Sequence, residues 1–167
     1  DSDIKLVVDQ FRTDLSGSSS LFLLRDDDKS DGIKLFSSGL TEAQQQFYVQ
    51  HHRQDVWFNH YLDKGCQGIV SANTISSSVG LLASFGAQFA AGGVCRVKGR
   101  GLSTLCSYRG AAQDDFSSRD LTSLTEIYSG LAAWSQHYWN LLALETQNYQ
   151  LQQLVKNHNK PSAIIDD

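Results

Sequence analysis

The segment from Ser118 to Asn157 limits the possible folds more than any other feature, because it holds no proline and is expected to form one continuous helix. Ser117 and Asp120 form a capping box at its start, and Phe116 and Leu121 fit the hydrophobic staple around that box. At 1.5 Å per residue this helix would be about 60 Å long, roughly twice the diameter of a small domain. Part of it must therefore project from the domain or pack on another chain.

The second half of this helix carries a seven-residue repeat. One seam position holds Trp134, Leu141, Asn148 and Val155, and the complementary position holds His137, Leu144 and Leu151. A polar Asn inside such a seam commonly fixes register and strand number in a two-stranded coiled coil. We therefore expect a homodimer, with Trp134, Leu141, Leu144, Asn148, Leu151 and Val155 at its seam. The alternative is a long core helix lying across its own sheet, and the first half, Leu121 to Leu131, favours that alternative.

The rest of the chain predicts helices and strands in alternation. Apolar spacing predicts helices over 4–15, 42–53, 56–62 and 79–89, and strands over 21–24, 33–36, 94–98 and 102–108, with 69–75 a strand or an extended loop. Thr41 and Gln44 form a capping box at the second helix. The first two strands suggest an antiparallel hairpin around an acidic turn, which is better explained as a solvated tip than as a cation site. We expect an α/β (α+β) fold, with a mostly antiparallel sheet flanked by helices.

The two strands around Gly99, Arg100 and Gly101 suggest a second hairpin. A tight turn there would place Cys95 opposite Thr104. Because side chains alternate along a strand, Cys95, Val97, Leu102, Thr104, Cys106 and Tyr108 would then share one face. A register shift of one residue would break this grouping.

The charge balance argues against direct nucleic-acid binding. The chain has 14 Lys and Arg against 18 Asp and Glu, a formal net charge of -4. A nucleic-acid binder usually carries a basic patch. The nearest candidate here lies around the second hairpin and is too small to outweigh the acidic remainder: Arg96, Lys98, Arg100 and Arg109. We expect contact with DNA only through another domain.

The cysteines and the N-terminus predict a cytoplasmic setting. Cys66, Cys95 and Cys106 form an odd set without disulfide-framework spacing, which fits a reducing compartment. Charges alternate with single apolar residues from Asp1 to Leu15, unlike a signal peptide. No apolar run approaches the roughly 20 residues of a membrane span, so no membrane partner is expected. The chain has no methionine, and we expect it to be part of a larger protein.

Enzyme and metal signatures are weak. The sequence has no phosphate-binding loop of the P-loop kind and no nucleophile elbow. Cys95 and Cys106 lie in apolar strands, where buried cysteines are ordinary. Four residues have side chains that can bind zinc, namely His51, His52, His60 and Cys66. Their spacing in the sequence matches no standard zinc-ligand pattern. We therefore predict neither an enzyme, nor a metal site, nor a cofactor.

Aromatic and polar side chains concentrate between Phe47 and Tyr61. Trp57 and Tyr61, spaced i and i+4, can face the same way, and ligand pockets often combine aromatic walls with a few polar groups. These residues could equally be ordinary core, with Asp55 as an N-cap. The candidate ligand-binding residues are Tyr48, Asp55, Trp57, Tyr61, Cys95, Thr104 and Cys106.

Three segments carry a family resemblance. The runs FYVQHHRQDVWFNHYLDKGCQGIVS, GGVCRVKGRGLSTLCSYR and DFSSRDLTSLTEIYSGLAAW resemble the N-terminal sensor domain of bacterial LuxR-type helix-turn-helix transcription regulators, a relative of the PAS and GAF folds. The resemblance extends from about Phe36 to Asn157. It implies a PAS/GAF-like antiparallel sheet with helices on both faces and a pocket between the sheet and the middle helices. The final run KPSAIIDD resembles the opening of a further PAS-like strand.

The resemblance also bears on the ligand. Asp55 followed by Val56 matches the Asp-Pro step of acyl-homoserine-lactone receptors, whose aspartate binds the ligand amide, and Tyr48 or Phe47 matches their pocket tyrosine. Val56 replaces the proline, and alanine and glutamine stand at 43–44, where a tryptophan belongs. The chain could therefore bind a different ligand, or no ligand at all.

These features predict three segments of the chain with different roles. Residues 1–132 are expected to form the sensor core, 133–157 a projecting signalling and dimerisation helix, and 158–167 a linker or the start of a further segment. The predicted function is ligand sensing in a transcription regulator, with a small molecule signalling to a helix-turn-helix domain outside this sequence. The alternatives are a dimerisation module without ligand and a GAF-fold enzyme that uses a cysteine.

Overall fold

The computed structural model describes residues 2–26, 32–56, 59–60, 68–71, 80–97 and 99–158 of the chain. Its helices and strands follow the order α1 (Ser2–Asp14), β1 (Ser19–Asp26), β2 (Ile33–Ser38), α2 (Glu42–His51), η1 (His52–Gln54), β3 (Gly68–Ser71), η3 (Gly80–Phe85), β4 (Ala87–Val97), β5 (Gly101–Gly110) and α4 (Ser118–His158). Trp57, Tyr61 and Cys66 lie outside the described residues, as does most of the helix expected over 56–62. No helix in the described part of the chain is long and apolar enough to cross a membrane.

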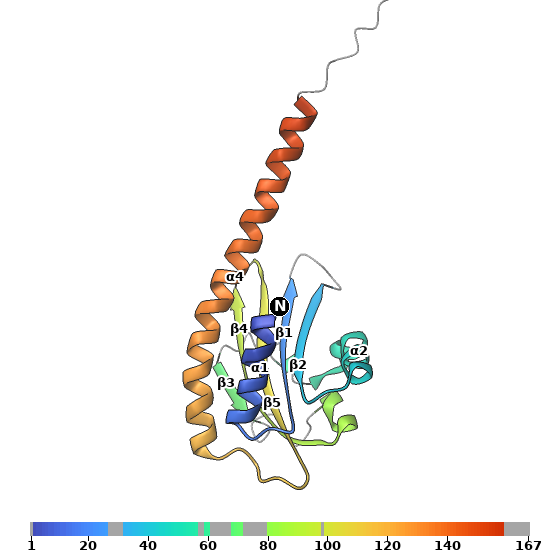
Figure 1. Cartoon of the computed structure of the whole chain (residues 1–167), viewed down its shortest axis with the longest axis vertical. Coiled ribbons are helices and arrows are strands. Elements are labelled where there is room, and N and C mark those ends of the chain that lie inside the picture. Colours follow the sequence, from blue (N-terminus) through green and yellow to red (C-terminus); the bar gives the residue numbers. More distant parts are fainter. Residues whose placement is uncertain are drawn as a thin grey trace, which may run out of the picture.

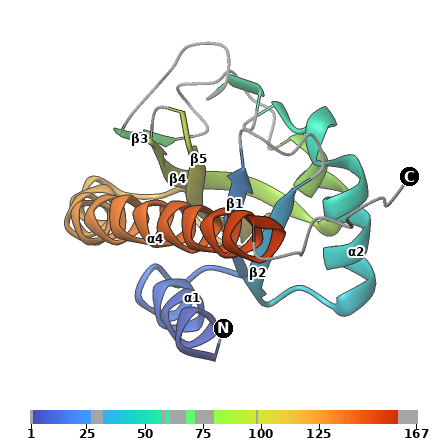
Figure 2. The ribbon, with the colours of Figure 1, turned by 90° about the horizontal axis from the view of Figure 1, so that it is seen from above.

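The strands form one antiparallel sheet with helices on both faces, as expected. The strand order is β2-β1-β5-β4-β3, and each neighbouring pair is antiparallel (Figure 1). Figure 2 shows α1 and α4 on one side of the sheet, whereas α2 and η3 pack on the other side. The α/β fold with a long C-terminal helix is therefore confirmed.

Alternation along β1 divides the buried side chains into two cores. Leu21 and Leu23 belong to the core under α2 and η3, whereas Phe22 and Leu24 belong to the core under α1 and α4. Successive side chains of a strand point to opposite faces, and both faces here are covered. This explains why the strand is a continuous apolar run rather than an alternating pattern.

The helix predicted over 79–89 is wrong. Of the described residues 80–89, only Gly80–Phe85 is helical, as a 3-10 segment, and β4 already begins at Ala87. Between them Gly86 adopts a positive φ of 82°, a conformation that glycine takes without strain and that does not continue a right-handed helix. The region is apolar but carries no polar stripe, so pairing with β5 overrides the weak helical pattern.

The β4–β5 hairpin has a different register from the one expected. Val94 lies opposite Thr104, and Cys95 lies opposite Ser103. Three residues separate the last paired positions, Val97 and Gly101, instead of the two of a tight turn. The extra residue shifts the register by one, which turns Cys95 to the opposite face from Thr104. The Cys95 thiol therefore points to α4, where its sulfur lies 3.9 Å from the carbonyl oxygen of Ala132.

Helix α4 packs on the sheet along its first half and projects along its second (Figure 1). Leu124 and Trp139 are buried in the core under α1 and α4, and the Tyr128 hydroxyl donates to the carbonyl of Val94. The interpretation of Leu121 to Leu131 as core is thereby confirmed. Beyond Trp139, α4 buries no residue up to Asn157. The packed part of α4 therefore extends as far as Trp139.

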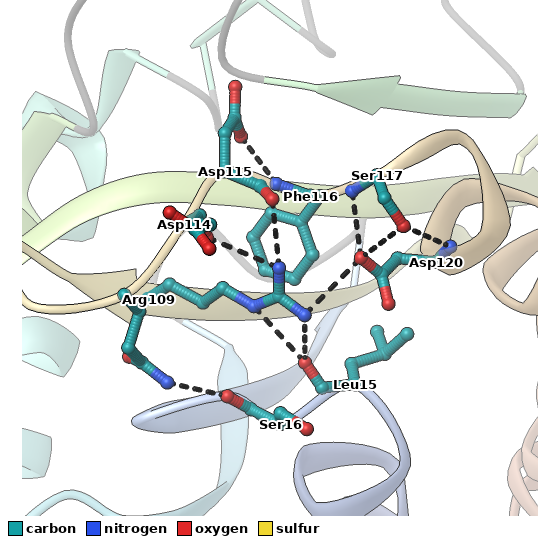
Figure 3. Close-up of polar contacts among 9 residues, drawn as sticks. Leu15, Ser16, Arg109, Asp114, Asp115, Phe116, Ser117 and Asp120 are labelled. Atoms are coloured by element: carbon teal, nitrogen blue, oxygen red, sulfur yellow. Dashed lines mark hydrogen bonds and ion pairs between the residues drawn. The ribbon is translucent and has the colours of Figure 1, made fainter.

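Arg109 joins the end of α1 to the start of α4 (Figure 3). Its Nε and Nη2 donate to the Leu15 carbonyl at 3.2 and 2.7 Å, and its Nη1 donates to the carbonyls of Asp114 and Asp115 at 3.2 and 2.9 Å. Nη2 also lies 3.3 Å from Oδ2 of Asp120. The guanidinium therefore satisfies backbone carbonyls from two separate segments, which the planar fork of an arginine suits well.

Because of these contacts, Arg109 is not part of a basic surface patch around the hairpin, which the sequence had suggested as a candidate. Only 9% of the residue is exposed, and its charge is taken up by Asp120 and by the Phe116 ring, whose centroid lies 4.2 Å away. Burial raises the pKa of Asp120, but hydrogen bonds from Ser117 and the charge of Arg109 outweigh it and hold the pKa below its ordinary value. Arg109 is thus a structural anchor, not part of a surface patch.

Candidate ligand-binding site

The candidate site lies on the sheet face covered by α2, η1 and η3. Strand β5 presents every second side chain to this face, which brings Thr104, Cys106 and Tyr108 into one row. Apolar side chains surround that row, and they are Leu21, Leu23, Leu82, Ala90, Val94 and Leu102. The face therefore combines apolar walls with a few polar groups, as small-molecule sites usually do.

Helix α2 brings Tyr48 onto this face. The capping box of Thr41 and Gln44 is present, with the Gln44 N–H donating to the Thr41 hydroxyl and Gln44 Oε1 accepting from the Thr41 N–H. It fixes where the helix starts and thus which side of it faces the sheet. Tyr48 is the buried residue of this helix. The capping box was predicted from the sequence, and the structure confirms it.

The Tyr48 hydroxyl donates to Oδ2 of Asp55 at 2.6 Å, and both side chains are buried. Asp55 directly follows η1, where its N–H donates to the His52 carbonyl at 3.0 Å. Only 1% of Asp55 is exposed. A buried carboxylate is costly unless donors surround it, so the short bond from Tyr48 is an important part of its environment.

Besides burial, the negative charge of Asp55 contributes to the raised pKa values of both Cys106 and Tyr108. Burial raises the pKa of the Cys106 thiol to about 12, and the Asp55 charge adds to the rise. Burial also raises the pKa of Tyr108, assisted by Cys106, Tyr48 and Asp55. Both groups are therefore neutral at physiological pH, and they offer weak donors and acceptors rather than charge.

Gly92 makes room for the Cys106 thiol. The two residues lie opposite each other on β4 and β5, and a Cβ at position 92 would lie 2.4 Å from the Cys106 sulfur. A larger residue at this position would displace the thiol or force the two strands apart. The glycine therefore shapes the floor of the candidate site.

The candidate residues chosen from the sequence are partly brought together. Tyr48, Asp55, Thr104 and Cys106 are buried around one face of the sheet. Cys95 faces α4 instead, because of the register shift in the hairpin. The placement of Trp57 and Tyr61 lies outside the described residues.

Two polar residues of this face were not chosen as candidates. Tyr108 follows Cys106 by two positions, and alternation along the strand already placed it on the face of Cys106, although it was not chosen as a ligand-binding residue. Ser37 lies opposite Leu21 on β2, and its buried hydroxyl has no hydrogen-bond partner within the described part of the chain. Nothing in the local sequence distinguishes Ser37 from the other serines.

The histidines near the site engage their own backbone. Nδ1 of His51 lies 2.9 Å from the Phe47 carbonyl, and Nδ1 of His52 lies 2.8 Å from the Val49 carbonyl. Among the described residues, no group of three His, Cys, Asp or Glu is placed to hold a metal ion.

Comparison with known proteins identifies the fold. No protein-family model matches the sequence, and no curated protein matches it. The structure resembles the GAF3 domain of Slr1393 from Synechocystis in its photoproduct state, with 16% identity, 85% and 96% of the two chains covered and a TM-score of 0.59. It also resembles a GAF domain/HD domain protein from Geobacter sulfurreducens, with 14% identity, 83% and 92% coverage and a TM-score of 0.58.

A third similar structure is CepR2 from Burkholderia cenocepacia, an N-acylhomoserine lactone dependent LuxR family transcription factor. Its identity is 12%, 80% of each chain is covered, and the TM-score is 0.52. At these identities the similarity shows a shared GAF-like fold. The expectation of a PAS/GAF-like architecture is confirmed at that level.

Proposed function

We propose that this GAF-like chain is a ligand-sensing regulatory domain of a bacterial LuxR-type transcription regulator. A small molecule binds between the sheet and α2, and α4 passes the bound state to an attached domain that contacts DNA. The buried Tyr48–Asp55 hydrogen bond, next to Cys106 and Tyr108, carries this proposal. A ligand can interact differently with the two states of such a buried polar pair, and this difference is what shifts a conformational equilibrium.

The chemistry of the site favours an uncharged ligand with an apolar body. Asp55 accepts hydrogen bonds, so the ligand presents an N–H or O–H to it, as an amide or a hydroxyl does. The walls around Thr104 and Cys106 are aliphatic and match a hydrocarbon portion. CepR2 depends on an N-acylhomoserine lactone, a molecule of this general type, but Val56 and positions 43–44 depart from the pattern of such receptors.

The projecting half of α4 supports a homodimer. The seam residues Trp134, Leu141, Leu144, Asn148, Leu151 and Val155 are all exposed in the monomer. Their heptad spacing on one helix face is the pattern of a coiled-coil seam. Two copies that pair along this face would carry their attached domains together.

The thiol chemistry argues against the alternative of a cysteine-dependent enzyme. A nucleophilic cysteine needs a lowered pKa, whereas burial raises the pKa of both Cys95 and Cys106. We therefore propose a binding function and no catalytic residue.

Differential scanning fluorimetry against a few hundred bacterial metabolites, acyl lactones included, tests the proposal. A ligand at 100 times its dissociation constant stabilises the fold by about 2.7 kcal/mol. A hit should lose affinity in Tyr48→Phe and Asp55→Asn, but not in Tyr149→Phe, a matched change at an exposed tyrosine. A flat screen of a well-folded dimer would favour the dimerisation module without ligand.

A further inference from the structure

A groove of about 310 Å³ lies between α1 and α4, on the face opposite the candidate ligand site. Figures 1 and 2 show the two helices side by side over this face of the sheet. Phe22 and Leu105 from the sheet line the groove, together with Val7 of α1 and with Ile127, Gly130 and Trp134 of α4. Its surface is largely hydrocarbon, which is costly to leave in water.

The rim of the groove is also apolar and exposed. Val7 is 57% exposed and Trp134 36%, and both line the groove. Single exposed apolar residues are normal, but a contiguous apolar patch marks an interaction site. These two residues therefore extend the groove into a surface that another macromolecule can cover.

The heptad register of α4 identifies that macromolecule. Moving back seven residues from Trp134 and His137 gives Ile127 and Gly130, which line the groove. The helix face that carries the exposed seam residues Leu144 and Leu151 thus continues into the groove without a break. One heptad earlier the register reaches Asp120 in the capping box, so the face ends there. A second chain that pairs along this seam would therefore also contact the groove.

Gly130 supports a close approach at this point. A Cβ at position 130 would meet no atom of the chain within 4 Å, so packing within the monomer gives no reason for a glycine. In a helix interior, glycine is about 1 kcal/mol less favourable than alanine. A small residue on a helix face permits close contact with a second helix, and here that helix must come from outside the monomer.

We propose that a second copy of this chain covers the groove. The two α4 helices meet along one face from Ile127 to Val155, and the α1–α4 groove of each copy packs against the same surface of the other around a two-fold axis. Val7 becomes buried in this interface. The inference rests on the homodimer of the proposed function but not on ligand sensing.

Three charge substitutions in the 167-residue chain test the interface by sedimentation equilibrium. Val7→Glu should raise the dimer dissociation constant at least about tenfold, because an unpaired carboxylate would be buried. Leu151→Glu should do the same at the projecting seam. Gln10→Glu places the same charge on α1 at an exposed position outside the groove lining and should leave the dissociation constant within about twofold.

Disulfide trapping tests the same interface without weakening it. In a Cys66→Ser background, Gly130→Cys should form an intermolecular disulfide under mild oxidation, because the two faces meet at this position. Ser129→Cys, one residue away and exposed, should not.

Each outcome separates the two proposals. If Val7→Glu dimerises like the unmodified chain while Leu151→Glu is monomeric, the seam dimer stands and the groove interface is overturned. A chain that is monomeric at every concentration overturns both, whereas the fluorimetry screen still tests ligand sensing. Dissociation by Val7→Glu together with trapping at Gly130→Cys supports the groove interface.

Discussion

The indole N–H of Trp139 donates to the hydroxyl of Ser103 at 3.2 Å, and both residues are buried. Ser103 lies on β5 between Leu102 and Thr104, whose side chains face the candidate ligand site on the opposite side of the sheet. Trp139 is the last buried residue of α4 before the helix projects. One strand thus contacts the candidate site with one face and the base of the projecting helix with the other.

Trp139→Phe should destabilise the chain. The change keeps an aromatic ring but leaves the Ser103 hydroxyl unpaired in the core, which costs about 1–3 kcal/mol. Urea unfolding followed by circular dichroism measures the loss. Trp134→Phe, at a more exposed position, should cost less. Equal effects of the two variants would mean that the hydrogen bond contributes nothing measurable.

Gly101→Ala and Gly130→Ala should act in opposite directions. A Cβ at position 101 would lie 2.3 Å from the Arg25 carbonyl oxygen and 2.5 Å from the Trp139 ring, so the strand or the helix must move, at a cost of about 1–3 kcal/mol. Within the monomer a Cβ at position 130 meets nothing, so in the Leu151→Glu background, where the dimer is weakened, alanine at this helix-interior position should stabilise by about 0.5–1 kcal/mol. Urea unfolding of both variants at matched concentration checks the sign of each change.

Arg109→Lys should weaken the junction between α1 and α4. A lysine carries a point charge and cannot reach the carbonyls of both Leu15 and Asp115 with a planar fork. Loss of buried bonds to these acceptors predicts a destabilisation of about 2–4 kcal/mol. Native-state hydrogen exchange should show faster exchange at the end of α1 and in the first turn of α4. Unchanged exchange there would show that Arg109 is not the anchor.

Asp120 should make stability depend on pH in the acid range. Its pKa is lower in the folded chain than its ordinary value, so the unfolded state binds its proton first. The stabilisation is present above the unfolded pKa of about 3.9 and is lost as pH falls through the folded pKa. Urea midpoints measured from pH 6 to pH 2.5 should fall less steeply in Asp120→Asn. Parallel curves for the two proteins would contradict this.

Cys106 should react slowly with thiol reagents in the native chain. A pKa of about 12 leaves almost no thiolate at neutral pH, and the side chain is buried. In a Cys66→Ser background, labelling by a maleimide at pH 7.4 should become rapid only after urea is added. Rapid labelling of the folded chain at Cys106 would reopen the possibility of a cysteine-dependent enzyme.

The sequence predicted those parts of the fold that depend on strong local signals. The capping boxes at Thr41 and Ser117 formed as expected, and the apolar runs of β1 and β2 paired as a hairpin. Short-range hydrogen bonds and turn residues decide these features, so they can be derived from neighbouring residues alone.

The predicted position of Cys95 was wrong because it depends on how β4 and β5 pair across the sheet. The register around Gly99 depends on whether two or three residues close the hairpin, and either length is compatible with the residues present. That choice moved Cys95 away from Thr104 and Cys106. The Arg109 anchor could not be predicted either, because its acceptors at Leu15 lie far away in the sequence and are backbone carbonyls.

The length of α4 beyond Trp139 makes it a lever arm. From Trp139 to His158 the helix extends about 28 Å at 1.5 Å per residue. With Trp139 as a fulcrum, a tilt of about 5° at the sheet would move the far end by about 2.5 Å, given the same rise per residue. A small displacement of β5 against Trp139 would therefore become a larger movement at the far end of α4.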